Sequence, residues 1–195
     1  MSKQFTMASF KSLPIEQFLT NLAAKQPTPG GGAAAAIGAS IGSAAASMAA
    51  AYTQRKVDIE SGAANKATSL IAALDVTPLL KAADDDASAY ADLQRTWKEG
   101  DTMPPEEKAA IEARALQIPI SLLESCHAQI LHIHEFLPFC NKNITSDAKV
   151  GMHQLAGAAR AAYQTVLVNS PPEDEKKRLQ QLLKEIRDME DSILS

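Results

Sequence analysis

A turn of proline and glycine opens directly into a long alanine-rich segment, and this junction constrains the fold more than any other feature. Residues 27–32 are Pro-Thr-Pro-Gly-Gly-Gly, and no charged side chain follows until Arg55. Prolines fix φ and lack a backbone donor, whereas glycines relax the steric limits on the backbone. Small residues recur every four positions of the segment, at Ala34, Gly38, Gly42, Ala46 and Ala50. The pattern predicts a closely packed helix behind a turn whose free amides suit an anionic or amide ligand.

The rest of the chain favours helices as well. Hydrophobic residues make up 46% of the 195 positions but aromatic residues only 5%, so the core must be largely Ala, Leu, Ile and Val. Such a core suits close-packed helices better than aromatic-rich strands. We therefore predict an all-α bundle of about six or seven helices, in a single domain spanning residues 1–195.

Cap and proline signals divide the chain into helices. Pro78 is expected to kink one helix and Pro119 to lie inside another. Ser146 or Asp147, and a capping box at Ser170, are expected to begin the last two helices. The expected helices are 15–22 after a cap at Ser12, a small-residue helix that ends at about 55, and helices at about 58–97, 105–137, 147–166 and 172–194. A loop is expected at 100–105.

The net charge, the cysteines and residues 1–12 narrow the expected partners and cellular compartment. The net charge of −4, without a basic aromatic stripe, argues against nucleic acid as a partner. Cys126 and Cys140 form no disulfide framework, and residues 1–12 show no signal peptide, so we expect a cytoplasmic protein. Serines interrupt the apolar run 33–51, which favours a buried helix over a membrane span.

The glycine turn does not match the common nucleotide motifs. No Gly-Lys-Ser/Thr follows it, as a phosphate-binding loop requires. Gly30, Gly32 and Ala35 have the spacing of a dinucleotide fingerprint, but the expected helix and two prolines precede them where that fingerprint needs a strand. Two interpretations stay open: a purely structural turn before a packed helix, and a turn that forms part of a ligand pocket.

Three successive aspartates, at 84–86, are expected on a helix. Steps of 100° spread them over more than half the circumference, so at least one should point inward or into a cleft. A partly desolvated carboxylate there would hold its proton more tightly and suit acid–base chemistry. The alternative is a solvated acidic face.

Two other polar groups could bind ligands. Glu124 and His127 have the Glu-x-x-His spacing of di-iron bundles, but no second copy of the motif exists, so packing histidines and no metal are expected. The polar stretch 141–147 holds amides, a hydroxyl, a carboxylate and an ammonium. Its simple role is capping, but it also offers the donors and acceptors that a pterin edge would need.

These pieces, in this order, resemble the cyclodeaminase/cyclohydrolase family of one-carbon folate metabolism, over nearly the whole chain. The shared segments are 27–32, Ser47-Met48, 53–56, 86–90, 105–108, Ile118-Pro119, 141–147 and 166–169. The chain departs from the family pattern at Arg55, Cys140 and Thr165, and Trp97-Lys98-Glu99 stands where the family often has a proline.

The resemblance implies an all-α homodimer that holds a tetrahydrofolate derivative, its substrate, near the glycine turn, with no separate cofactor. Asp86 matches the family's catalytic aspartate, and Asp147 is a second candidate. Gly30, Gly31, Gly32, Lys56, Asn141 and Ser146 are the expected substrate-binding residues. The expected reaction is cyclodeamination of 5-formiminotetrahydrofolate or hydrolysis of 5,10-methenyltetrahydrofolate, and the alternative is a non-catalytic folate-binding or assembly protein.

Overall fold

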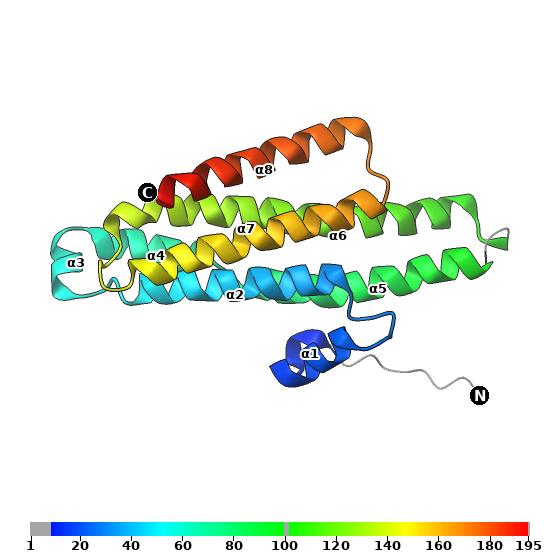
Figure 1. Ribbon diagram of the computed structural model, residues 1–195, viewed down its shortest axis with the longest axis horizontal. Helices are drawn as coiled ribbons and strands as arrows, with labels where there is room; N and C mark the ends of the chain where they lie inside the picture. Colours follow the sequence, from blue (N-terminus) through cyan, green and yellow to red (C-terminus); the bar gives the residue numbers. More distant parts are fainter. Residues whose placement is uncertain (1–8, 100–101, 195) are drawn as a thin grey trace.

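Long helices lie along the longest axis of the protein in the computed structural model (Figure 1), which describes residues 9–99 and 102–194. Neither range contains a strand, so the predicted all-α fold is confirmed. Parts of the predicted domain 1–195 and loop 100–105, namely residues 1–8, 100–101 and 195, lie outside the described residues. The elements are η1 (Phe10–Ser12), α1 (Ile15–Ala23), α2 (Gly31–Ala51), α3 (Lys56–Glu60), α4 (Ala63–Ala73), α5 (Thr77–Glu99), α6 (Pro105–Phe136), η3 (Leu137–Phe139), α7 (Thr145–Val168) and α8 (Glu173–Ile193).

The small-residue helix, α2, is the centre of the bundle, since it packs against α7, α5, α4 and α6. Its most extensive contact is with α7, and there Gly42 faces Gly151. A Cβ on Gly42 would lie 2.8 Å from the carbonyl oxygen of Gly151, and one on Gly151 would lie 2.7 Å from that of Gly42. Only glycine at both positions lets the two backbones approach this closely. The predicted close packing of this helix is therefore confirmed.

By length and composition α2 is also apolar enough to cross a membrane, with a mean hydropathy of 1.4. Inside the bundle, 56% of that stretch is buried by the protein itself. Its apolar composition is thus accounted for by its central position, because a helix surrounded by other helices is apolar on most of its circumference.

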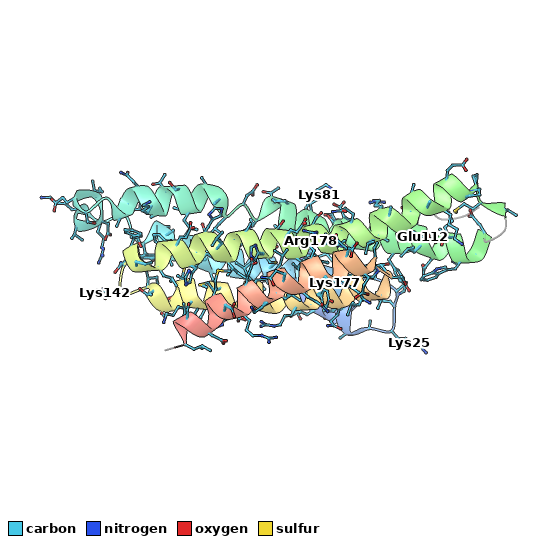
Figure 2. The ribbon with its side chains drawn as sticks, turned by 90° about the horizontal axis from the view of Figure 1, so that it is seen from above. Lys25, Lys81, Glu112, Lys142, Lys177 and Arg178 are labelled. Carbon is cyan, nitrogen blue, oxygen red and sulfur yellow. The ribbon has the colours of Figure 1, made fainter. Side chains whose placement is uncertain are left out.

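Charged side chains hold α8 against α6 and α7, beside which it lies in Figure 1. Arg178, labelled in Figure 2, bonds Glu124 of α6 at 2.7 Å, and Nε2 of His127 lies 2.8 Å from Oε2 of Glu185. Both members of the Glu-x-x-His pair therefore have partners on α8, which confirms the packing interpretation of His127. In the described ranges no three His, Cys, Asp or Glu side chains gather as a metal site needs.

The helix expected at about 58–97 is wrong as a single kinked element, because it is divided into α3, α4 and α5. The break between α3 and α4 ends at Gly62, whose φ of +80° lies in the left-handed region that glycine favours. Before α5, Oδ1 of Asp75 accepts a hydrogen bond from the Thr77 amide at 2.8 Å. Pro78 then falls in the first turn of α5, where a missing amide costs nothing. The proline begins a helix here instead of kinking one.

Three expected caps are also wrong, since no side chain caps α1, α7 or α8. Ser12 belongs to η1. The turn in which the Ile144 amide donates to the Asn141 carbonyl lets α7 begin at Thr145, two residues before the expected start, so Ser146 and Asp147 lie inside the helix. Ser170 has φ of +53° and its amide donates to the Leu167 carbonyl. It closes the end of α7 and does not cap α8.

Candidate functional site

The glycine turn and the acidic stretch of α5 meet at the start of α2. The first amides of α2 have no partner within the helix, and the Ala33 amide donates to Oδ2 of Asp86 at 3.0 Å. Gly32 allows this approach, because a Cβ there would lie only 2.0 Å from Oδ1 of Asp86. The positive end of the α2 dipole further favours a carboxylate at this position.

The other two aspartates of the stretch have structural partners. Asp84 accepts hydrogen bonds from the Phe10 amide at 2.6 Å and from the Ser9 hydroxyl. Asp85 forms an ion pair with Lys81 on the surface of the same helix. The prediction that at least one of the three points inward is confirmed, and Asp86 is the one that reaches the glycine turn.

Burial raises the pKa of Asp86 above its ordinary value of 3.8, while the hydrogen bond from Ala33 acts in the opposite direction. The net shift is upward because the lost hydration of the charged form outweighs one hydrogen bond. A carboxyl group with a raised pKa exchanges protons more readily near neutral pH.

A groove opens over Asp86 between the turn, α5 and α7. Its main hollow, of about 540 Å³, includes Gly30, Gly31, Gly32, Tyr90 and Gln164 in its lining. An adjoining hollow of about 280 Å³ is lined by Leu93 and Trp97. The two hollows share Asp86, Tyr90, Thr165 and Val168, and we call them together the Asp86 groove. Its size is that of sites for small organic ligands, about 300–1,000 Å³.

Asn169 ties the end of α7 to α6 beside this groove. Pro119 has no amide to donate to the carbonyl of Ala115, one turn earlier in α6. The side-chain amide of Asn169 donates to that carbonyl at 3.3 Å and to the Thr165 carbonyl at 2.9 Å. A proline inside α6 is therefore compensated from α7, and the compensation holds one wall of the groove in place.

The remaining predicted site residues lie at the opposite end of α2, about 31 Å away for 21 residues at 1.5 Å each. There the Asn141 amide donates to Oγ1 of Thr53 at 3.0 Å. Figure 2 shows Lys142 of this loop far from Lys25, which precedes the glycine turn. Lys56 begins α3 at the same end. Within one chain the structure brings Gly30–Gly32 to Asp86, but not Lys56 or the 141–147 segment.

Most polar groups of the 141–147 segment, which includes the first residues of α7, bond within the segment or to the end of α2. The buried side chain of Asn141 donates to the Tyr52 carbonyl at 3.1 Å and accepts from the Asn143 amide at 3.1 Å. The Ser146 hydroxyl donates to the Asp147 carboxylate at 3.2 Å. These bonds give the 141–147 segment a structural role, and its contact with a substrate stays a prediction.

The similarity of this chain to known proteins includes the regions described above. The sequence pattern of the formiminotransferase-cyclodeaminase family matches residues 14–188, which include the glycine turn, Asp86 and the far loop. The chain belongs to this family.

One relative in sequence and one solved structure are similar to this chain. The chain is 29% identical over 181 residues to a methenyltetrahydrofolate cyclohydrolase of Methylorubrum extorquens, covering 88% of this chain and 86% of the relative. The crystal structure of a formiminotetrahydrofolate cyclodeaminase from Thermotoga maritima has the same fold, with a TM-score of 0.79 and 20% identity over 93% of this chain and 92% of that one.

The departures from the family pattern lie in two places. Arg55 is held by Asp58, with Nε and Nη2 each 2.8 Å from a carboxylate oxygen. Cys140 is buried, and burial raises the pKa of its thiol. Both belong to the far end of α2, so only Thr165 and Trp97 among the departures reach the Asp86 groove.

For several residues of the Asp86 groove, the sequence predicted no role. Tyr90, Leu93 and Trp97 follow Asp86 at four, seven and eleven positions, so helical periodicity alone places them on the same face of α5. Gln164 and Val168 of α7 have no such signal. They reach the groove only because of the way α7 crosses α2.

Replacing Gly32 by Ala is expected to displace the Asp86 carboxylate, because the new Cβ would lie within 2.8 Å of three of its atoms. A shift of about 1 Å at a reacting group costs roughly 100-fold in rate. Steady-state kinetics with circular dichroism would separate this loss from unfolding. The matched control is Gly157→Ala in α7, where the added Cβ meets nothing within 4 Å. Equal rates for both variants would contradict the expectation.

Asp86 should also make stability depend on pH. The raised pKa means that the folded protein holds the Asp86 proton more tightly than the unfolded chain does. This stabilisation is complete below pH 3.8 and is lost as the pH rises through the raised pKa. The Tm of Asp86→Asn minus that of the wild type should therefore increase as the pH rises from 3.8 toward neutral. Thermal melts across that range test the sign, and a difference that stays constant or decreases would contradict it.

Proposed function

We propose that this protein is an enzyme of one-carbon folate metabolism that acts on the carbon bridging two nitrogens of a reduced folate. The observation that carries the proposal is the Asp86 carboxylate, held by the Ala33 amide in a groove of ligand size. The names of the family and of the Methylorubrum relative support the substrate class, because both refer to chemistry at this carbon.

In hydrolysis of 5,10-methenyltetrahydrofolate, water attacks the bridging carbon and one of its two C–N bonds breaks. A formyl group forms, one water proton goes to the departing nitrogen and the other is released. We assign to Asp86 the removal of a proton from the attacking water and its return to that nitrogen. A carboxyl group with a raised pKa suits both halves of this transfer.

In cyclodeamination of 5-formiminotetrahydrofolate, the second folate nitrogen attacks the formimino carbon and ammonia leaves. The methenyl product is a cation, so the reaction takes up one proton overall when ammonia leaves neutral. Asp86 would accept the proton of the attacking nitrogen and donate to the departing one. Both reactions pass through a tetrahedral carbon bearing two folate nitrogens, so the same placement of one carboxyl group serves either.

The polar edge of the pterin would lie at the turn. Backbone groups of Gly30, Gly31 and Gly32 line the groove without side chains, and the exposed amide of Gln164 faces the same hollow. Backbone and amide groups offer both donors and acceptors, which a pterin edge requires.

Lys56, Asn141, Ser146 and Asp147 stay part of the proposal only in a homodimer. They lie at the far end of α2 from Asp86, so a second copy running in the opposite direction would have to present them to the groove. Light scattering tests this: twice the 20.8-kDa chain mass supports it, and a monomer that turns over folate refutes it.

One assay tests the function and distinguishes the reactions. The absorbance of 5,10-methenyltetrahydrofolate should fall faster with the protein if it hydrolyses this compound. The same absorbance should rise from 5-formiminotetrahydrofolate, with release of ammonia, if the protein is a cyclodeaminase. Calorimetric binding of these folates without either change would support the non-catalytic alternative, and no binding would refute both.

A further inference from the structure

Trp97 is the only tryptophan of the chain, and its side chain is 64% exposed. Its ring lies edge-to-face against Tyr90, with centroids 5.9 Å apart and an interplanar angle of 80°. Neighbouring Val168 of α7 is 79% exposed. A large aromatic side chain normally buries most of its surface, so an exposed tryptophan that packs on a half-buried tyrosine beside a groove is typical of a ligand contact.

Tyr90 and Trp97 follow Asp86 along the same face of α5. Tyr90 follows Asp86 by one helical turn, about 6 Å, and Trp97 follows it by about 16 Å at 1.5 Å per residue. All three side chains line the same hollow. A ligand that reacts at Asp86 and extends along α5 would therefore meet first Tyr90 and then Trp97.

The two ends of the Asp86 groove differ in chemistry. The turn end offers the backbone groups of Gly30–Gly32 and the amide of Gln164, whereas Ala89, Leu93 and the ring of Trp97 line only the α5 end. Val168 lines both hollows. A reduced folate also offers different groups at its two ends. Its pterin carries many donors and acceptors, and the aminobenzoyl ring, bonded directly to one of the two reacting nitrogens, is a flat apolar group.

We propose that Tyr90 and Trp97 form the subsite for the aminobenzoyl ring, which places the pterin at the glycine turn. This inference rests on the proposed function, which puts the pterin at the turn, and adds the residues that hold the aminobenzoyl half of the substrate. Trp97 is a positioning residue here: it holds the ring and takes no part in the proton transfers. Stacking of this kind contributes about 0.5–1.5 kcal/mol, which corresponds to roughly 2- to 13-fold in affinity.

The test compares wild type, Trp97→Ala and Trp97→Phe with three probes. In Trp97→Ala, affinity for the full tetrahydrofolate and for p-aminobenzoylglutamate should fall about tenfold by calorimetry. Affinity for tetrahydropterin, which lacks the benzoyl ring, should not change. KM should rise while kcat stays the same, and Trp97→Phe should recover most of the affinity. Phe139→Ala, which removes an exposed aromatic ring elsewhere on the bundle, is the matched control.

The outcomes separate this inference from the proposed function. If the wild type turns over folate and Trp97→Ala has unchanged affinity for all three probes, the subsite is wrong and the function stands. An equal loss of affinity for tetrahydropterin would overturn the assigned direction. If the wild type neither binds nor converts any reduced folate, the function fails and the subsite with it.

Discussion

Replacing Asp86 by Asn is expected to lower turnover of the folate by about 100- to 10,000-fold, the usual contribution of a positioned acid–base group. The asparagine keeps the shape of the side chain and can still accept the hydrogen bond from the Ala33 amide, which is 3.0 Å long in the wild type. It cannot carry a proton between the attacking and departing atoms. The fold should survive, so kcat should fall while the helical circular dichroism signal is unchanged.

Asp85→Asn is the matched control, because it removes a carboxylate from the neighbouring position of the same helix. Asp85 pairs with Lys81 on the helix surface and does not line the Asp86 groove, so its variant should turn over folate at nearly the wild-type rate. Surface ion pairs of this kind contribute about 0–1 kcal/mol to stability. Wild-type-like turnover by Asp86→Asn would refute the role of Asp86. Equal losses in both variants would point to a general effect of charge.

Replacing Gly42 by Val is expected to lower the free energy of unfolding by about 3 kcal/mol or more, because overpacking at a close contact forces backbones apart. A Cβ at this position would lie 2.8 Å from the Gly151 carbonyl oxygen and 2.9 Å from the Leu155 amide nitrogen. Both are backbone atoms, which cannot rotate away as a side chain does. Since α2 packs most extensively on α7, separating these helices weakens the centre of the bundle.

Chemical denaturation measures this loss, and the matched control lies one turn away in the same helix. A Cβ at Gly38 meets nothing within 4 Å, so Gly38→Ala should raise stability by up to about 1 kcal/mol through helix propensity. The reciprocal variant Gly151→Val should be destabilised like Gly42→Val, because its Cβ would lie 2.7 Å from the Gly42 carbonyl oxygen. Similar stabilities for the Gly38 and Gly42 variants would show that α2 and α7 separate easily at this point.

Local sequence signals predicted the helices well and their breaks less well. The long run of small residues indicated α2, because a face without bulk has a purpose only against another helix. The division between α4 and α5 was missed because Pro78 has the same sequence appearance as a kink within a helix and as the first turn of a new one. The hydrogen bond from Thr77 to Asp75 decides between them, and it depends on the local backbone.

The sequence alone determined the all-α fold, the close-packed central helix and an inward-facing aspartate within residues 84–86. Each follows from helical periodicity or from the steric properties of neighbouring residues, which depend only on short stretches of the chain. Only the tertiary structure decided which predicted site residues meet. A rigid helix of 21 residues separates the turn and Asp86 from the 141–147 segment, so two groups of residues that could each bind a ligand lie about 31 Å apart. The tertiary structure also placed Gln164 and Val168 in the Asp86 groove, because the crossing of α2 and α7 depends on contacts between residues far apart in the chain.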